Sequence, residues 1–417
     1  MSVKENIKTF VSNENTFVFL IALVLITLPL KHIINSISII LFICFSLIYS
    51  LIYKRKVRFN KVIIVFISIY ILVVLSLLWT INFDDSTKGL QKMLSFFVIP
   101  VGFMLMPELN DQKILKILSY FSYSMVIYAL FCIIIGVSKF LISQDTSHLF
   151  YHSLSSPLNQ INAIYLSVYI AFSLFYFIIN TRSEKIKHYF PIIILMIFLL
   201  LLSSKIIISF TFLVIVVYLV KIRHNLLFIS ALFLLIASFM LFMPDAPNNV
   251  KQRVNTEVLK TRTTEVLTKN DFGQNYYWTG FGLRLFQARS YFEMVNEDHV
   301  FSMGYGISAS QKKLIQKYQA YNIYPGFYNY NFHNQYIQIL AELGILGFLL
   351  LISIFFLGII NSIKYKNLLF IVFNFLILFI CITESYLWRQ RGMVFFITVF
   401  LLLYKASSNF NYTKNIN

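Results

Sequence analysis

Residues 332–351 have the sequence FHNQYIQILAELGILGFLLL, in which a short polar start leads into a long apolar run. A helix needs roughly 20 mostly apolar residues to cross the hydrocarbon core of a bilayer. His333 and Asn334 therefore stand at the mouth of a predicted membrane-spanning helix. Further along, Gly344 and Gly347 suit close helix packing within lipid. This stretch predicts a helical membrane protein with polar chemistry at one helix mouth.

The composition of the whole chain agrees with this class. Of its 417 residues, 58% are hydrophobic and only 12% are charged, whereas an ordinary soluble domain carries about 25% charged residues. The 44 Phe and 26 Tyr fit a protein with much lipid-facing and interfacial surface. These values exclude a soluble globular protein.

About twelve stretches of the chain are candidates for transmembrane helices, so we expect an all-α, polytopic fold. About nine of them lie in residues 1–243, and about three lie in residues 334–417, ahead of a polar tail. Between them, residues 244–333 form the one extended polar region, with several helical runs and a glycine turn at Met303 to Gly306. A loop of this length is usually functional or disordered, and we expect a functional one.

The distribution of Lys and Arg among the short loops predicts the orientation, because positive residues concentrate on the cytoplasmic side. Both termini are then cytoplasmic, while the 244–333 loop, the turn at 385–391 and an acidic turn at Asp84 and Asp85 face the periplasm. The net charge of +18 is largely this topology signal and does not indicate a nucleic acid partner. The basic loop residues are Lys54, Arg55, Lys56, Arg58, Lys61, Lys113, Lys116, Arg182, Lys185, Lys187, Lys221, Arg223, Lys364 and Lys366.

Two titratable residues lie on the helix that begins near residue 334. His333 is a candidate general base, since a histidine can take up a proton near neutral pH; the alternative is an interfacial histidine satisfied by hydrogen bonds. Glu342 comes nine residues later, about 13 Å into the bilayer if the helix is continuous. We expect Glu342 to be a structural partner of a cation or helix mouth, with a catalytic role as the alternative.

Several strings, in this order, resemble one family. LLLSSKIIIS, from Leu200, is similar to a Ser-Arg pair at an outer helix mouth, although the residue here is Lys205, which keeps the charge but loses the planar fork. GFGLRLFQARSYFEMV followed by MGYG resembles a loop arginine, helix and Gly-x-Gly turn, which puts the arginine at Arg284. With the His-Asn string at 332–351 and TESYLWRQRGMVFF from Thr383, these resemble the O-antigen ligase and O-antigen polymerase superfamily of bacterial membrane proteins.

The resemblance implies a membrane glycosyltransferase of lipopolysaccharide or polysaccharide biosynthesis in the bacterial inner membrane. Its donor would be a glycan linked to undecaprenyl diphosphate, among membrane lipids, and its active site would be periplasmic. A ligase transfers the glycan to the lipid A core, and we favour this branch; an O-antigen or capsular polysaccharide polymerase transfers it to another carrier-linked glycan.

The resemblance also implies roles for single residues. Arg284 and His333 would be catalytic, with His333 as the base, while Arg284 and Lys205 would bind the diphosphate and Asn334 would contact substrate. The alternatives are a solvated loop charge for Arg284 and a snorkelling flank residue for Lys205. Arg289 lies about 140° further round an ideal helix than Arg284, so we expect it to be a structural or surface partner.

Arg389 and Arg391 occupy the turn beside Glu384, and we count them as further substrate-binding candidates. An ion pair at the helix end, combined with interfacial anchoring, is an equal alternative for both.

No cofactor or metal ion is expected. His148 and His152 are four residues apart, but no third ligand accompanies them, and zinc takes three or four protein ligands. The main rival function is a lipid or polysaccharide transporter or flippase, which would place substrate groups near the middle of the membrane. Apart from Glu342, the interiors of the predicted spans lack charged residues, so we favour the enzyme over both a transporter and a structural scaffold.

Overall fold

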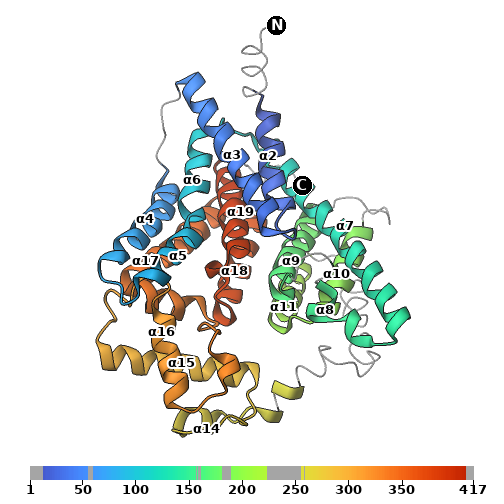
Figure 1. The fold of residues 1–417 in the computed structure, drawn as a ribbon. Helices are drawn as coiled ribbons and strands as arrows, with labels where there is room; N and C mark the ends of the chain where they lie inside the picture. The colour runs from blue at the N-terminus through green and yellow to red at the C-terminus, as the bar shows by residue number, and fades with distance from the viewer. Residues whose placement is uncertain are drawn as a thin grey trace. The chain divides into compact units, whose positions relative to one another are not determined.

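The computed structural model describes residues 13–54, 60–155, 157, 161–180, 189–222, 255–257 and 259–409 (Figure 1). Within these ranges the regular structure is helical and contains no strand, which confirms the predicted all-α class. The predicted span near residues 225–243 and the start of the predicted loop lie outside the described residues.

Six helices in the described part of the chain are long and apolar enough to cross a membrane, and four shorter ones are also apolar. A multi-pass membrane protein is therefore confirmed. The six are α3 (His32–Tyr53), α4 (Lys61–Leu75) with η1 (Ser76–Leu78), α5 (Phe83–Met93) with α6 (Ser95–Leu105), α7 (Asp111–Ser143), α9 (Ala163–Asn180) and α17 (Gln335–Lys364). The shorter ones are α2 (Glu14–Ile26), α10 (Phe190–Leu201), α11 (Lys205–Ile222) and α18 (Leu368–Thr383).

The chain divides into two compact units, of which the first comprises residues 1–25, 36–114 and 260–417. In this unit α17 and α18 pack against each other, α17 also packs against α4, and α19 (Gln390–Asn409) packs against α6. Aromatic rings fill the space between these helices: the Phe66 ring meets those of Phe396 and Phe400 edge-on, with centroids 5.9 and 5.6 Å apart. Both parts of the chain that flank the predicted outer loop thus share one core.

The second unit comprises residues 26–35 and 115–259. Helix α9 lies at its centre and packs against α10, α11 and the short α8 (Tyr151–Ser155). Nearly the whole surface of α9 is buried. His148 lies in η2 (Thr146–Leu149) and His152 in α8, so the two histidines do not share the one helix that a metal pair would need.

The predicted acidic turn at Asp84 and Asp85 is wrong, because both residues are helical. Asp84 and Asp85 form the first turn of α5, and the Asn82 side chain accepts a hydrogen bond from the Asp85 backbone N–H at 3.3 Å. An amide oxygen at the cap position and negative charge in the first turn both stabilise a helix start. Asn82, Asp84 and Asp85 are therefore residues typical of the start of a helix.

The described part of the predicted outer loop folds around its own small core. Its helices are α14 (Thr263–Thr268), α15 (Gly280–Asp298) and α16 (Ser310–Ala320), followed by η4 (Pro325–Phe327). Phe286 and Tyr318 are fully buried between them, and their rings stack with centroids 5.9 Å apart. The helical runs predicted at 283–297 and 311–322 are confirmed.

The predicted glycine turn joins this loop to α17. Gly304 and Gly306 have φ of +70° and +90°, a region that residues with a Cβ rarely occupy. The backbone N–H groups of Tyr305 and Gly306 donate to the carbonyls of Ala341 and Glu342 at 2.8 and 3.0 Å. A Cβ on Gly304 would meet the Glu342 backbone, so only glycine allows this close approach.

Helix α17 breaks at Gly344, where φ is +63° and ψ is −162°. The Ile345 N–H, which follows the break, donates to the Phe301 carbonyl of the loop at 3.0 Å. A broken helix at membrane depth is tolerated only where protein or water satisfies the freed backbone groups. Here the loop backbone satisfies them, so the break holds the loop against α17.

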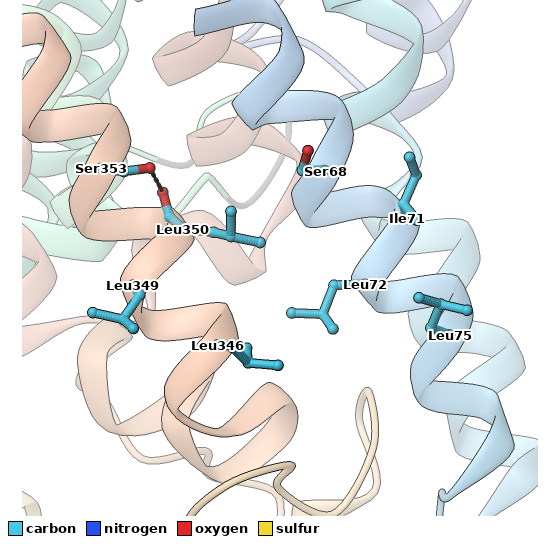
Figure 2. A pocket seen from close by; sticks show the side chains of 8 residues that line it. All are labelled: Ser68, Ile71, Leu72, Leu75, Leu346, Leu349, Leu350 and Ser353. Carbon is cyan, nitrogen blue, oxygen red and sulfur yellow. Dashed lines mark hydrogen bonds between the residues drawn. The ribbon is translucent and has the colours of Figure 1, made fainter. Parts of the chain in front are cut away.

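An apolar groove lies between α4 and α17 in the same unit (Figure 2). The Ser353 hydroxyl donates to the carbonyl of Leu350 on its own helix at 2.7 Å. No titratable residue lines the groove, so the groove itself supplies no acid or base. The lining residues are Ser68, Ile71, Leu72, Leu75, Leu346, Leu349, Leu350 and Ser353.

We predict that Gly344→Ala destabilises the protein far more than Gly273→Ala. Both glycines have positive φ, but a Cβ at Gly344 would collide with the Ser302 carbonyl, whereas a Cβ at Gly273 meets nothing within 4 Å. Gly273→Ala should cost only the left-handed backbone, about 1–2 kcal/mol, and Gly344→Ala about 3 kcal/mol or more. Thermal unfolding in detergent measures both, and equal melting temperatures would contradict the described break.

Candidate functional site

Asn334 is the N-cap of α17. Its side-chain oxygen accepts hydrogen bonds from the N–H groups of Tyr336 and Ile337 at 2.9 and 3.1 Å, and its amide nitrogen donates to the Ile382 carbonyl at 3.0 Å. An asparagine suits this position because it satisfies N–H groups that have no partner within the helix. Asn334 thus joins the start of α17 to the end of α18, and its role in substrate binding stays a prediction.

His333 immediately precedes this cap and has a left-handed backbone, with φ of +45°. The Asn331 side chain accepts a hydrogen bond from its backbone N–H at 3.0 Å, which offsets part of the cost of that conformation. The imidazole Nδ1 then lies 3.2 Å from Oε2 of Glu384. The ring is half-buried, so it remains accessible from one side.

Glu384 follows the last residue of α18, and its carboxylate joins two predicted site residues. Oε1 accepts a hydrogen bond from Nη2 of Arg284 at 2.8 Å, while Oε2 contacts His333. The Glu384 side chain is only 9% exposed. We call the contacts of Arg284, Glu384 and His333 the Glu384 bridge; it brings together residues from α15, the α18 end and the α17 mouth.

Two more hydrogen bonds hold the Arg284 guanidinium in place. Its Nε donates to the Thr383 carbonyl at 2.8 Å, and its Nη1 donates to the Gly280 carbonyl one turn earlier at 2.9 Å. An arginine has five N–H donors, and within the described contacts three are used. The side chain is 29% exposed, so it can still meet an anion while its orientation is set by protein.

The charge state of Glu384 determines which tautomer His333 adopts. Burial would raise the pKa of the Glu384 carboxyl, but the hydrogen bond and charge of His333, together with Arg284, outweigh burial and lower the pKa below 4.5. Glu384 is therefore a carboxylate at neutral pH, and a carboxylate only accepts hydrogen bonds. Whenever the His333 ring is neutral, its contact with this carboxylate requires the proton on Nδ1, which leaves the Nε2 lone pair to accept a proton.

A second row of buried polar side chains supports the same turn. Gln335 accepts a hydrogen bond from the Leu387 N–H at 2.8 Å, and Gln338 donates to Oε1 of Glu342 at 2.8 Å. The Ser310 hydroxyl also donates to this oxygen at 2.6 Å. These contacts support the structural role expected of Glu342. Of the two expected partners, a cation or a helix mouth, the hydrogen bonds described here involve neutral side chains.

The other predicted cations belong to other elements of the chain. Lys205 begins α11 in the second unit, where its ammonium pairs with Glu257 at 3.0 Å. In the first unit, Arg389 is exposed just before α19, and Arg391 is buried in the first turn of α19. The structure thus brings Arg284 and His333 into one bridge, and the substrate-binding roles of the other cations stay predictions.

Arg289 has the structural role that was expected of it. Its guanidinium forms an ion pair with Glu293 at 2.9 Å and donates to the carbonyls of Val266 and Lys269 at 3.1 and 2.8 Å. It also lies over the Tyr321 ring. These contacts tie α15 to neighbouring parts of the loop, and the prediction is confirmed.

Among the described residues, no group of three or more His, Cys, Asp or Glu side chains comes together as a metal site would require. The Glu384 bridge itself consists of one cation, one carboxylate and one imidazole.

Glu384 was not predicted as a site residue, although it stood in the quoted string TESYLWRQRGMVFF. The available signal was an isolated carboxylate at the end of an apolar helix, on the same predicted side as a candidate base. A buried carboxylate requires paired charge or hydrogen bonds, so this position alone suggested a nearby cation or histidine.

Residues 189–352 match the family model described as O-Antigen ligase. The match contains Lys205, Arg284, His333 and Asn334, and it confirms the resemblance to the O-antigen ligase superfamily. It supports a membrane glycan transferase of the O-antigen ligase or polymerase type. No curated protein matches the chain.

We predict that the stabilising effect of the Glu384 carboxylate disappears in acid. A carboxyl whose pKa is lowered by folding stabilises the protein above its unfolded pKa, and this contribution is lost as the pH falls through the folded pKa. Glu384→Gln should therefore cost about 2 kcal/mol at pH 7, at least as much at pH 5, and progressively less below about pH 4.5. Melting temperatures of both proteins across this range provide the measurement. A difference that already shrinks between pH 7 and 5.5 would mean that burial dominates and raises the pKa.

Proposed function

We propose that this O-antigen ligase-like protein transfers a glycan from undecaprenyl diphosphate to an acceptor hydroxyl on the periplasmic face of the bacterial inner membrane. The observation that carries the proposal is the Glu384 bridge, in which one carboxylate holds both a partly exposed arginine and a histidine. The family match over residues 189–352 supports the same class of reaction.

His333 acts as the general base in this proposal. The acceptor oxygen forms a bond to the anomeric carbon of the donor glycan, and the bond from that carbon to the diphosphate oxygen breaks. The hydroxyl proton passes to Nε2 of His333, and the bonding electron pair leaves with the diphosphate. Glu384 stabilises the resulting imidazolium, because its carboxylate faces Nδ1 at 3.2 Å.

Arg284 holds the leaving diphosphate. Its two unused N–H donors and permanent positive charge suit phosphate oxygens, and its fixed orientation lowers the entropy lost on binding. A diphosphate is already a good leaving group, so stabilising its charge is the main requirement at that end of the reaction. Lys205 belongs to the second unit, where it pairs with Glu257, and its role in phosphate binding stays a separate prediction.

Contacts within the first unit agree with the proposed sidedness. Lys113 pairs with Glu14, and both positions were predicted to be cytoplasmic. Gln390, in the predicted outer turn at 385–391, donates to the Ser36 hydroxyl at 3.0 Å. Ser36 lies near the N-terminal end of α3, which the predicted topology puts on the outer side. The Glu384 bridge lies next to Gln390 along the chain and would therefore be periplasmic.

Within this class we favour the ligase, with the lipid A core as acceptor, over an O-antigen or capsular polysaccharide polymerase. A transporter or flippase remains the rival from another class, since the broken α17 resembles the discontinuous helices of some carriers. The break at Gly344 is filled by the loop backbone, and such filling favours a fixed scaffold over a substrate path.

We predict that His333→Ala lowers glycan transfer about 100- to 10,000-fold, the usual contribution of a general base, while binding of the lipid-linked donor is nearly unchanged. The measurement uses purified protein, a defined lipid-linked glycan and, in parallel, lipid A core or a second lipid-linked glycan as acceptor.

His299→Ala is the matched control, because His299 caps the far end of α15 and should leave transfer unchanged. Product with lipid A core identifies a ligase, and product with the second carrier-linked glycan identifies a polymerase. Normal transfer by His333→Ala would remove the proposed base.

A further inference from the structure

Aromatic side chains recur at every third residue before His333, namely Tyr324, Phe327 and Tyr330. The chain here forms successive turns with hydrogen bonds three residues apart: Phe327 N–H to Tyr324 O at 3.1 Å, and Tyr330 N–H to Phe327 O at 2.9 Å. In such turns, as in a 3₁₀ helix, side chains at i and i+3 lie above one another. The sequence period and the backbone period therefore coincide.

The three rings form a continuous row that ends on the candidate base. Ring centroids are 6.0 Å apart from Tyr324 to Phe327, 5.4 Å from Phe327 to Tyr330 and 5.3 Å from Tyr330 to His333. Each pair meets edge-to-face, the arrangement that aromatic rings prefer. We call the first three rings the aromatic ladder.

Contacts of neighbouring residues fix the segment that carries the ladder, and two of its rings stay exposed to solvent. Tyr328 stacks on the buried ring of Tyr318, with centroids 6.1 Å apart. The Gln311 amide donates to the carbonyls of Tyr328 and Tyr330 at 2.8 and 3.0 Å. Tyr324 and Tyr330 remain 52% and 42% exposed. Phe327, between them, is partly buried against the loop core. The two tyrosine rings are therefore kept exposed on a braced segment that the core supports, and they form a preorganised surface.

The chemistry of this surface fits a sugar chain. Residues 322–341 contain no Lys, Arg, Asp or Glu, so the ladder does not attract phosphate groups by charge. Aromatic faces carry partial negative charge, and the C–H face of a pyranose ring presents weakly positive hydrogens to them. The tyrosine hydroxyls and the exposed Asn329 amide supply the hydrogen bonds that sugar hydroxyls need.

We propose that the aromatic ladder binds the glycan and directs its reacting end to His333. This inference rests on the proposed function, because it assigns a subsite to the same reaction. Sugar rings lie along Tyr324 and Phe327, and the ring nearest the reacting bond contacts Tyr330 beside the imidazole.

The test measures binding without catalysis. The probe is the lipid-free oligosaccharide that mild acid releases from the cell's own carrier-linked glycan, titrated into purified protein by calorimetry. We expect Tyr324→Ala to weaken binding about tenfold, the upper range for one aromatic contact, and Tyr324→Phe to bind like the wild type because it keeps the ring. Phe292→Ala is the matched control, since Phe292 is an equally exposed ring of the same loop, at 62%, outside the ladder.

Two results would overturn the proposal. One is unchanged affinity in Tyr324→Ala, as expected if these rings only anchor the protein at the lipid headgroups. The other is equal weakening by Phe292→Ala. Wild-type protein separates this inference from the proposed function: oligosaccharide binding by a wild type that transfers no glycan to either acceptor would support the ladder and remove only the proposed reaction.

Discussion

A buried carboxylate must have charged or hydrogen-bonding partners, and the arrangement around Glu384 follows from that requirement. Its two oxygens face Arg284 and His333 at 2.8 and 3.2 Å. Through these contacts the outer loop, the end of α18 and the mouth of α17 meet at one point. The same contact fixes the proton on Nδ1 of His333 and leaves Nε2 available, so one interaction supplies both the local architecture and the proposed base.

Two irregular backbone segments of the same unit fix the loop beside α17. Helix α17 breaks at Gly344, and the glycine turn at Gly304 and Gly306 enters beside it. Because loop N–H and carbonyl groups replace the helical partners, the loop is attached to the membrane helix by main-chain bonds. Charge neutralisation at Glu384 then completes a site that side chains alone would hold less rigidly.

The sequence predicted the helical class, the loop helices and the glycine turn because each depends on local composition. Arg284 and His333 were predicted through motif order, whereas Glu384 was not, since it meets them across 100 and 51 residues of chain. The broken α17 was missed because Gly344 also suits ordinary helix packing. Lys205 was predicted as an anion binder from its position, and its ion pair with Glu257 depends on a contact 52 residues away.

The central claim is that Glu384 acts on the reaction through His333. A double-mutant cycle of glycan-transfer rates for wild type, Glu384→Gln, His333→Ala and the double variant tests it most directly. The account predicts that Glu384→Gln slows transfer in the wild type but has almost no further effect once His333 is alanine, because its target is gone. If the fold-losses in rate of the two single variants multiply in the double variant, the two residues act independently. That result would contradict the claim that Glu384 acts through His333.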